Sequence, residues 1–102
     1  IQMKMSKQRM MQDVPTADVV ITNPTHYAVA LKYDQEVNDA PLIVAKGIDY
    51  IALKIKNIAR DSNIHIIEDV QLARALYDNA EVGEAIPEDM YKAIAEIFTY
   101  IY

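Results

Sequence analysis

The chain has 102 residues, an apolar fraction of 52%, a net charge of −5 and no cysteine. This length fits one globular domain with a single core. The apolar fraction is too high for a disordered chain. The acidic balance argues against nucleic acid as a partner, and the lack of cysteine excludes disulfides and thiolate chemistry.

The first residues predict a basic helix. Residues 1–12 contain good helix formers and no helix breaker, and residues 1–11 hold three basic side chains and no acid. No run of about 18 apolar residues is present, so no membrane-spanning segment is expected. A start at Ile1 rather than Met suggests a piece of a longer protein. A basic segment before an acidic domain fits a position just cytoplasmic of a membrane. Composition alone favours the simpler alternative, the solvated start of a helix that contains methionines.

Apolar patterning predicts four strands and three further helices. The predicted strands are 17–22, 27–33, 42–45 and 64–67. The predicted helices are 48–61, 70–77 and 87 to the C-terminus. Gly47 is expected to end the third strand, Asp69 to cap a helix, and Pro87 to be the first residue of the last helix. Residues 35–41 and 79–86 are predicted loops.

The order of these elements predicts an α/β fold with a mixed four-stranded sheet flanked by helices. A short connection at residues 23–26 makes the first two strands an antiparallel hairpin. Strand–helix alternation after residue 42 favours a parallel portion in the same sheet.

Asn23-Pro24-Thr25-His26 connects the first two strands and has an unusual chemical option. Asn favours the first position of a β-turn and Pro the second, so the segment predicts a turn. Pro24 has no N–H, which closes the usual deamidation of Asn by the following backbone nitrogen. What remains is attack by the Asn23 side-chain nitrogen on its own backbone carbonyl. That reaction forms a succinimide, expels Pro24 as an amine and breaks the chain.

The same turn contains groups that can assist the reaction. A turn brings His26 towards the Asn23 amide, and an imidazole can accept its proton and then protonate the departing Pro24 nitrogen. The Thr25 hydroxyl can polarise the carbonyl or position water. Two alternatives stay open: an inert turn on a docking module, and a small α/β enzyme that uses His26 on an added substrate.

The motif and its surroundings resemble the FlhB/YscU family of type III export-apparatus proteins. The matching stretches are 17–34, Ala45-Lys46-Gly47, 66–69, 72–74, 82–83 and 86–87, so the resemblance covers essentially the whole chain. Residues Tyr27–Asp34 resemble the flagellar branch, FlhB, more than the injectisome branch, which is the alternative within the family.

The resemblance implies a domain, residues 17–102, that cuts itself once between Asn23 and Pro24 and turns over no substrate. Fragments 1–23 and 24–102 are expected to stay together, and residues 1–16 are the expected end of a linker helix. A membrane domain absent here is expected to hold the protein at the cytoplasmic face of the bacterial inner membrane.

The role implied is a switch in export specificity from hook and rod to filament subunits. The partners implied are other export-gate components, a ruler (hook-length control) protein, and export substrates with their chaperone complexes.

The last predicted helix has two adjacent apolar stripes, which form one broad face. Burial of both stripes is one explanation. The other is that Ala95 and Phe98, with Ala40 and Pro41, line a shallow exposed patch for a partner segment. In flagellar relatives, the resemblance implies that this patch docks export substrates.

No metal or cofactor is expected. His65 lies between isoleucines in a predicted strand and is expected to be a sheet-edge or core histidine. The second histidine is far away in sequence, and no carboxylate is suitably spaced. The chain also has no glycine-rich phosphate loop.

Overall fold

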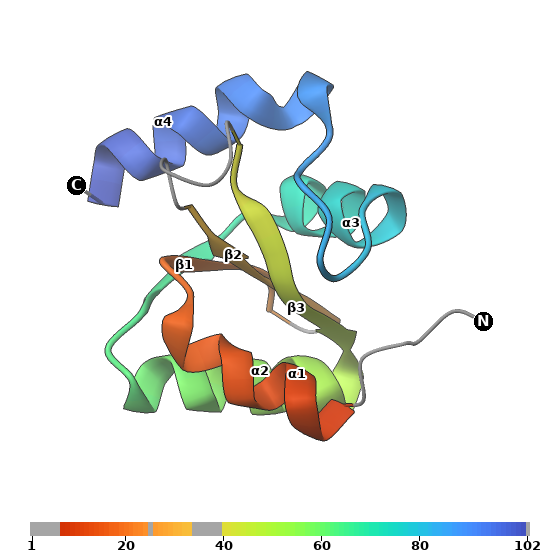
Figure 1. Cartoon of the computed structure of the whole chain (residues 1–102), viewed down its shortest axis with the longest axis vertical. Coiled ribbons are helices and arrows are strands. Elements are labelled where there is room, and N and C mark those ends of the chain that lie inside the picture. Colours follow the sequence, from red (N-terminus) through yellow and green to blue (C-terminus); the bar gives the residue numbers. More distant parts are fainter. Residues whose placement is uncertain (1–6, 25, 34–39, 102) are drawn as a thin grey trace.

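Four strands form the middle layer of a three-layer arrangement, with helices on both faces (Figure 1). The computed structural model describes residues 7–24, 26–33 and 40–101. The strands are β1 (Val19–Asn23), β2 (Tyr27–Lys32), β3 (Leu42–Ile48) and β4 (His65–Glu68). The α-helices are α1 (Lys7–Asp13), α2 (Asp49–Asp61), α3 (Val70–Asn79) and α4 (Tyr91–Ile101). The 3₁₀ turns are η1 (Val14–Thr16) and η2 (Glu88–Met90).

The sheet is mixed, as predicted, with the strand order β3-β2-β1-β4. β1 pairs with β2 in an antiparallel hairpin, and β2 pairs with β3 in the same sense. β4 adds in parallel to the other edge of β1. β1 therefore has a hydrogen-bonded neighbour on each side.

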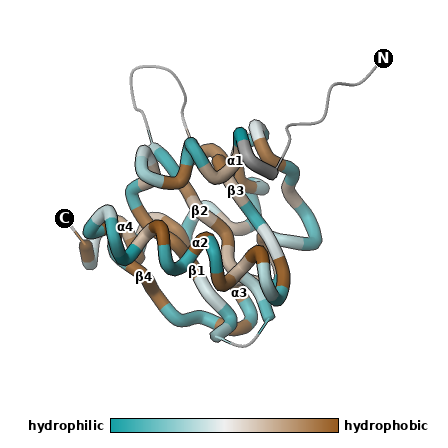
Figure 2. Tube along the Cα trace, turned by 90° about the horizontal axis from the view of Figure 1, so that it is seen from below, coloured by the Kyte–Doolittle hydropathy of each residue, from teal (hydrophilic) through white to brown (hydrophobic). Residues whose placement is uncertain are grey.

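Alternating side chains of the strands fill two cores, one on each face of the sheet. The side chains packed with α3 and α4 include Val19, Ile21, Val29, Leu31 and Ile43. Those packed with α1 and α2 include Val20, Ala28, Ala30 and Ala45. Figure 2 shows hydrophobic and hydrophilic residues interspersed along α2. Ala52, Ile55 and Ala59 of this helix are buried in the core on this face of the sheet. The small side chains on this face allow α2 to approach the strands closely.

Gly47 lies inside β3, so the prediction that it ends the third strand at Ala45 was wrong. A Cβ atom added at residue 47 would clash with the Ile51 side chain, lying 2.7 Å from its Cβ, and would lie 3.3 Å from the backbone nitrogen of Ala52. The glycine is therefore explained by the close approach of α2 to the strand.

Pro87 precedes the last helix rather than opening it, so this boundary prediction was also wrong. Its ψ of 148° is extended, the turn η2 follows, and α4 begins at Tyr91. The cause lies in the preceding segment, which pairs with the β3 edge. Ala85 bridges to Leu42, and the Ile86 N–H donates to the Pro41 carbonyl at 3.0 Å. This pairing keeps the chain extended up to the proline.

The other helix and strand boundaries differ from the predicted ones by a few residues. β1 begins at Val19 rather than residue 17, and α3 continues to Asn79. The predicted cap at Asp69 is confirmed, since its carboxylate accepts the Leu72 N–H at 3.1 Å. Residues 1–6 of the first predicted helix and 35–39 of the predicted loop lie outside the described residues. No described helix is long and apolar enough to cross a membrane.

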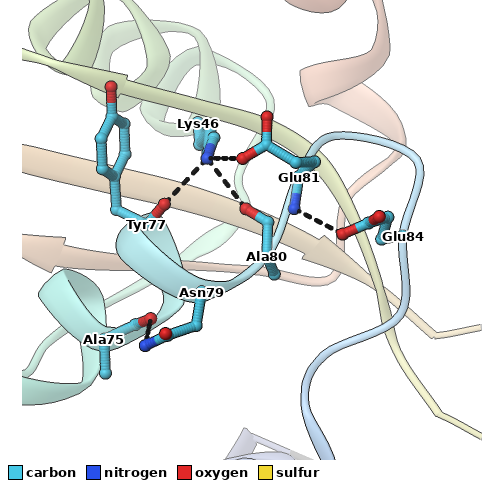
Figure 3. A network of polar contacts seen from close by, with 7 residues as sticks. All are labelled: Lys46, Ala75, Tyr77, Asn79, Ala80, Glu81 and Glu84. Atoms are coloured by element: carbon cyan, nitrogen blue, oxygen red, sulfur yellow. Dashed lines mark hydrogen bonds and ion pairs between the residues drawn. The ribbon is translucent and has the colours of Figure 1, made fainter.

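Lys46 of β3 ties the C-terminal end of α3 to the sheet (Figure 3). Its ammonium donates to the backbone carbonyls of Tyr77 and Ala80 at 2.8 and 2.9 Å, and pairs with the Glu81 carboxylate at 2.8 Å. It also lies 4.5 Å from the centre of the Tyr77 ring. A cation is favourable here because the last carbonyls of a helix have no intrahelical donor.

Candidate functional site

Asn23 is the last residue of β1, and a tight turn follows it directly. The His26 N–H donates to the Asn23 carbonyl oxygen at 3.1 Å, so the predicted β-turn is confirmed. This carbonyl belongs to the Asn23–Pro24 peptide bond and therefore already has a backbone donor. Thr25, the third residue of the motif, lies outside the described residues.

The chain before the turn is fixed in the sheet. Val19, Val20 and Ile21 are fully buried, and Thr22 is 3% exposed. The Thr22 carbonyl accepts the N–H of Asp69 at 2.9 Å, where β4 leads into α3. Asn23 is thus attached to a buried strand that has neighbours on both sides.

The chain after the turn is held by α2. The Asp49 N–H donates to the His26 carbonyl at 2.9 Å, and its carboxylate lies 3.3 Å from His26 Nδ1. Lys56 Nζ donates to the Pro24 carbonyl at 2.9 Å. Asp49 and Lys56 are about two helical turns apart, so they lie on one face of α2. This face contacts residues on both sides of Thr25.

Asp49 has an unusual backbone conformation, with φ at 49°. An L-residue in the left-handed region costs about 1–2 kcal/mol. Asn63 also has a positive φ, but it follows the C-cap of α2, where asparagine and glycine are common. Asp49 stands at the start of the helix, where no such capping motif explains it.

Sequence reasoning missed Asp49 and Lys56. An acid in the first turn of a helix and a lysine further along are ordinary features of a solvated helix face. Their contacts with the turn join residues 23 and 32 positions apart in the chain. The predicted residues Asn23, Pro24 and His26 do come together, and the His26 ring is directed at Asp49.

The four residues predicted to form an apolar patch also come together. Ala40, Pro41, Ala95 and Phe98 line a pocket of about 240 Å³, shared with two tyrosines and two isoleucines. Ala95 is exposed, whereas Phe98 and Ala40 are buried in the pocket lining. The rings of Tyr33 and Phe98 pack against each other at an angle of 46°, with their centres 5.7 Å apart. The apolar face of the last helix is therefore partly buried and partly exposed. This result lies between the two alternatives of complete burial and an exposed patch.

Within the described parts of the chain, no three His, Asp or Glu side chains are grouped so that they could hold a metal ion. His65 is exposed on β4, an edge strand of the sheet, which fits its predicted sheet-edge position.

Comparison with known proteins gives matches over nearly the whole chain. A model of the "FlhB HrpN YscU SpaS Family" matches residues 1–101. The flagellar biosynthetic protein FlhB of Bacillus subtilis (strain 168) is 57% identical over 101 residues, which make up 99% of this chain and 28% of that protein. The chain thus spans little more than a quarter of this relative's length.

Two solved structures have the same fold. The cytoplasmic domain of FlhB from Shewanella putrefaciens matches with a TM-score of 0.91 and 44% identity, over 94% of this chain and 74% of that one. A mutated EscU C-terminal domain matches with a TM-score of 0.87 and 32% identity, over 91% of this chain and 93% of that one.

Proposed function

The chain belongs to the FlhB/HrpN/YscU/SpaS family, and on that premise we propose that it is the cytoplasmic domain of a flagellar type III export component that cuts its own backbone once, between Asn23 and Pro24. The observation that carries the proposal is the turn itself. An asparagine that ends a buried strand is followed by proline, and its carbonyl oxygen accepts a hydrogen bond from the His26 N–H at 3.1 Å.

The reaction is an intramolecular displacement at the Asn23 carbonyl carbon. The side-chain nitrogen of Asn23 attacks that carbon and closes a five-membered ring. Negative charge develops on the carbonyl oxygen, which the His26 N–H stabilises. The bond to the Pro24 nitrogen then breaks. The proton lost by the attacking nitrogen passes through the His26 imidazole to the departing Pro24 amine.

This reaction gives two fragments. Fragment 1–23 ends in a succinimide, which water later opens to a free carboxylate. Fragment 24–102 begins with the secondary amine of Pro24. The proposed role of the Thr25 hydroxyl is to polarise the carbonyl or to position water. No outside substrate is consumed, so the domain acts once and is not a turnover enzyme.

Positioning favours this reaction because both sides of the scissile bond are held. The strand fixes the residues before the bond, and α2 holds Pro24 and His26 after it. Fixed geometry of this kind can lower the activation barrier by several kcal/mol.

The cut is proposed to free the Pro24 end without unfolding the domain. In this account residues 1–16 end a linker from a membrane domain, and residues 17–102 lie at the cytoplasmic face of the inner membrane. The cleaved domain works with other export-gate components, a ruler protein, and substrates with their chaperones. The freed Pro24 end can change its position on the domain. This movement allows the switch in export from hook and rod subunits to filament subunits.

Denaturing mass spectrometry of the purified chain during incubation at neutral pH tests the cleavage. The wild type is expected to give fragments 1–23 and 24–102, whose masses add up to the intact 11.6 kDa until water opens the succinimide. Asn23→Ala is expected to stay intact. Asn57→Ala, at an exposed asparagine of α2, is the matched control and should be cut like the wild type. A wild-type chain that stays whole, or is cut at another bond, contradicts the proposal.

The apolar pocket favours docking as a second function of the same domain. It is concave, and Tyr91 and Ala95 of its lining are exposed while the other lining residues are buried or half-buried. We propose that an apolar segment of an export substrate binds there. Ala95→Asp in the full-length protein is expected to lower substrate export and leave self-cleavage unchanged. Export at the wild-type level would exclude the pocket as the docking site.

A further inference from the structure

We propose that Asp49 is a positioning residue that orients the His26 imidazole for self-cleavage. The inference rests on the proposed function, because it assigns a second residue to the same site. Asp49 belongs to α2 and is separated from the motif by two strands of the sheet, so only the fold brings it to the turn.

Two contacts join Asp49 to His26, and they are of different kinds. The Asp49 N–H donates to the His26 carbonyl at 2.9 Å, which fixes the backbone of the turn. Its carboxylate oxygen lies 3.3 Å from His26 Nδ1, which restrains the ring. One residue therefore holds both the backbone and the side chain of the histidine.

The carboxylate selects a form of the ring that suits proton transfer. A carboxylate accepts hydrogen bonds, so it favours the tautomer of the neutral imidazole that bears its proton on Nδ1. Nε2 is then the unprotonated ring nitrogen that can accept the proton of the Asn23 amide. A base oriented by a third group is a recurrent arrangement for activating a nucleophile.

Stability alone does not explain the arrangement. The side chains of His26 and Asp49 are 63% and 69% exposed, and ion pairs in water contribute little to folding. Asp49 also holds a left-handed backbone with φ at 49°, which aspartate and asparagine adopt more readily than most residues but which still costs more than it would for glycine. An unfavourable backbone that supports a weak contact beside the turn points to a role in the reaction.

Cleavage rates of variants test the role. Asp49→Gly removes the carboxylate, so it should slow cleavage about tenfold, which is part of the rate enhancement that a general base contributes. Glycine adopts the left-handed backbone without a penalty, so the substitution should not lower the stability of the fold. Asp49→Asn should be slowed less, because asparagine tolerates this backbone and its amide oxygen can accept from Nδ1–H. Asp61→Asn, at the other end of α2, should cut like the wild type. An Asp49→Gly chain that cuts as fast as the wild type, or faster, overturns the inference.

The tautomer can be measured separately from cleavage. In the Asn23→Ala background, ¹⁵N NMR of the neutral imidazole should show His26 protonated on Nδ1, shifting towards Nε2 when Asp49→Gly is added. The chain has two histidines, so His65→Gln assigns the signals. Unchanged ring signals would also overturn the inference. If the wild type is never cut, the proposed function fails, and the NMR measurement still decides whether Asp49 orients the ring.

Discussion

Pro24 differs from any other residue that could follow Asn23 in lacking a backbone N–H. With an N–H at that position, the following nitrogen can attack the asparagine side chain, which deamidates it and leaves the chain whole. Without it, the proposed reaction is attack by the asparagine side chain on its own backbone carbonyl. That carbonyl accepts the His26 N–H in the folded turn, so the preferred electrophile is already polarised.

Pro24→Ala is therefore expected to open a second reaction. The restored N–H allows deamidation at Asn23, so an intact chain with an acid in place of the amide should accumulate. Peptide mapping by mass spectrometry detects it. Pro15→Ala, at an exposed proline that follows Val14, is the control and should show no new product. Chain cleavage as the sole outcome in Pro24→Ala would mean that the missing N–H does not decide the chemistry.

The local parts of the site could be predicted from sequence, and the distant parts could not. A turn at Asn23–His26 follows from the preferences of Asn and Pro. The contacts of Asp49 and Lys56 with this turn depend on how α2 packs under the sheet, which no local pattern encodes. Asp49 also has a left-handed backbone, which cannot be predicted from the sequence because most aspartates, although enriched there, do not adopt it.

At the scale of elements, α2 and β3 decide how the site is built. Gly47 in β3 lets α2 lie close to the strand, and α2 in turn presents Asp49 and Lys56 to the turn. Sequence patterning predicted these elements and the mixed sheet. It misplaced the end of β3, since a glycine inside a strand is expected to end it unless another element packs against that position.

Lys46 connects β3 to α3 and should matter for stability. Its side chain is 14% exposed and donates to two backbone carbonyls at the end of α3. Lys46→Met leaves these carbonyls without their donor and is expected to lower the free energy of unfolding by about 2 kcal/mol.

Urea unfolding in the uncleavable Asn23→Ala background measures this effect. Lys92→Met, at an exposed lysine of α4, is the control and should change the free energy of unfolding by no more than about 0.5 kcal/mol. Equal unfolding midpoints for the two variants would show that Lys46 does not support the end of α3.

At the scale of the whole molecule, the proposed cut would fall at the end of a strand that is paired on both sides. Fragment 1–23 contributes β1, and β1 lies between β2 and β4, which both belong to fragment 24–102. Its side chains Val19, Val20 and Ile21 are fully buried in the two cores. Each fully buried side chain of this kind contributes about 1.5–3 kcal/mol. The fragments should therefore stay associated after the peptide bond is gone.

The most direct test of this account compares one incubated wild-type sample under denaturing and native mass spectrometry. Denaturing conditions are expected to release fragments 1–23 and 24–102, while native conditions give a single species near the intact 11.6 kDa. A single uncut chain under denaturing conditions, or separated fragments under native conditions, would contradict it.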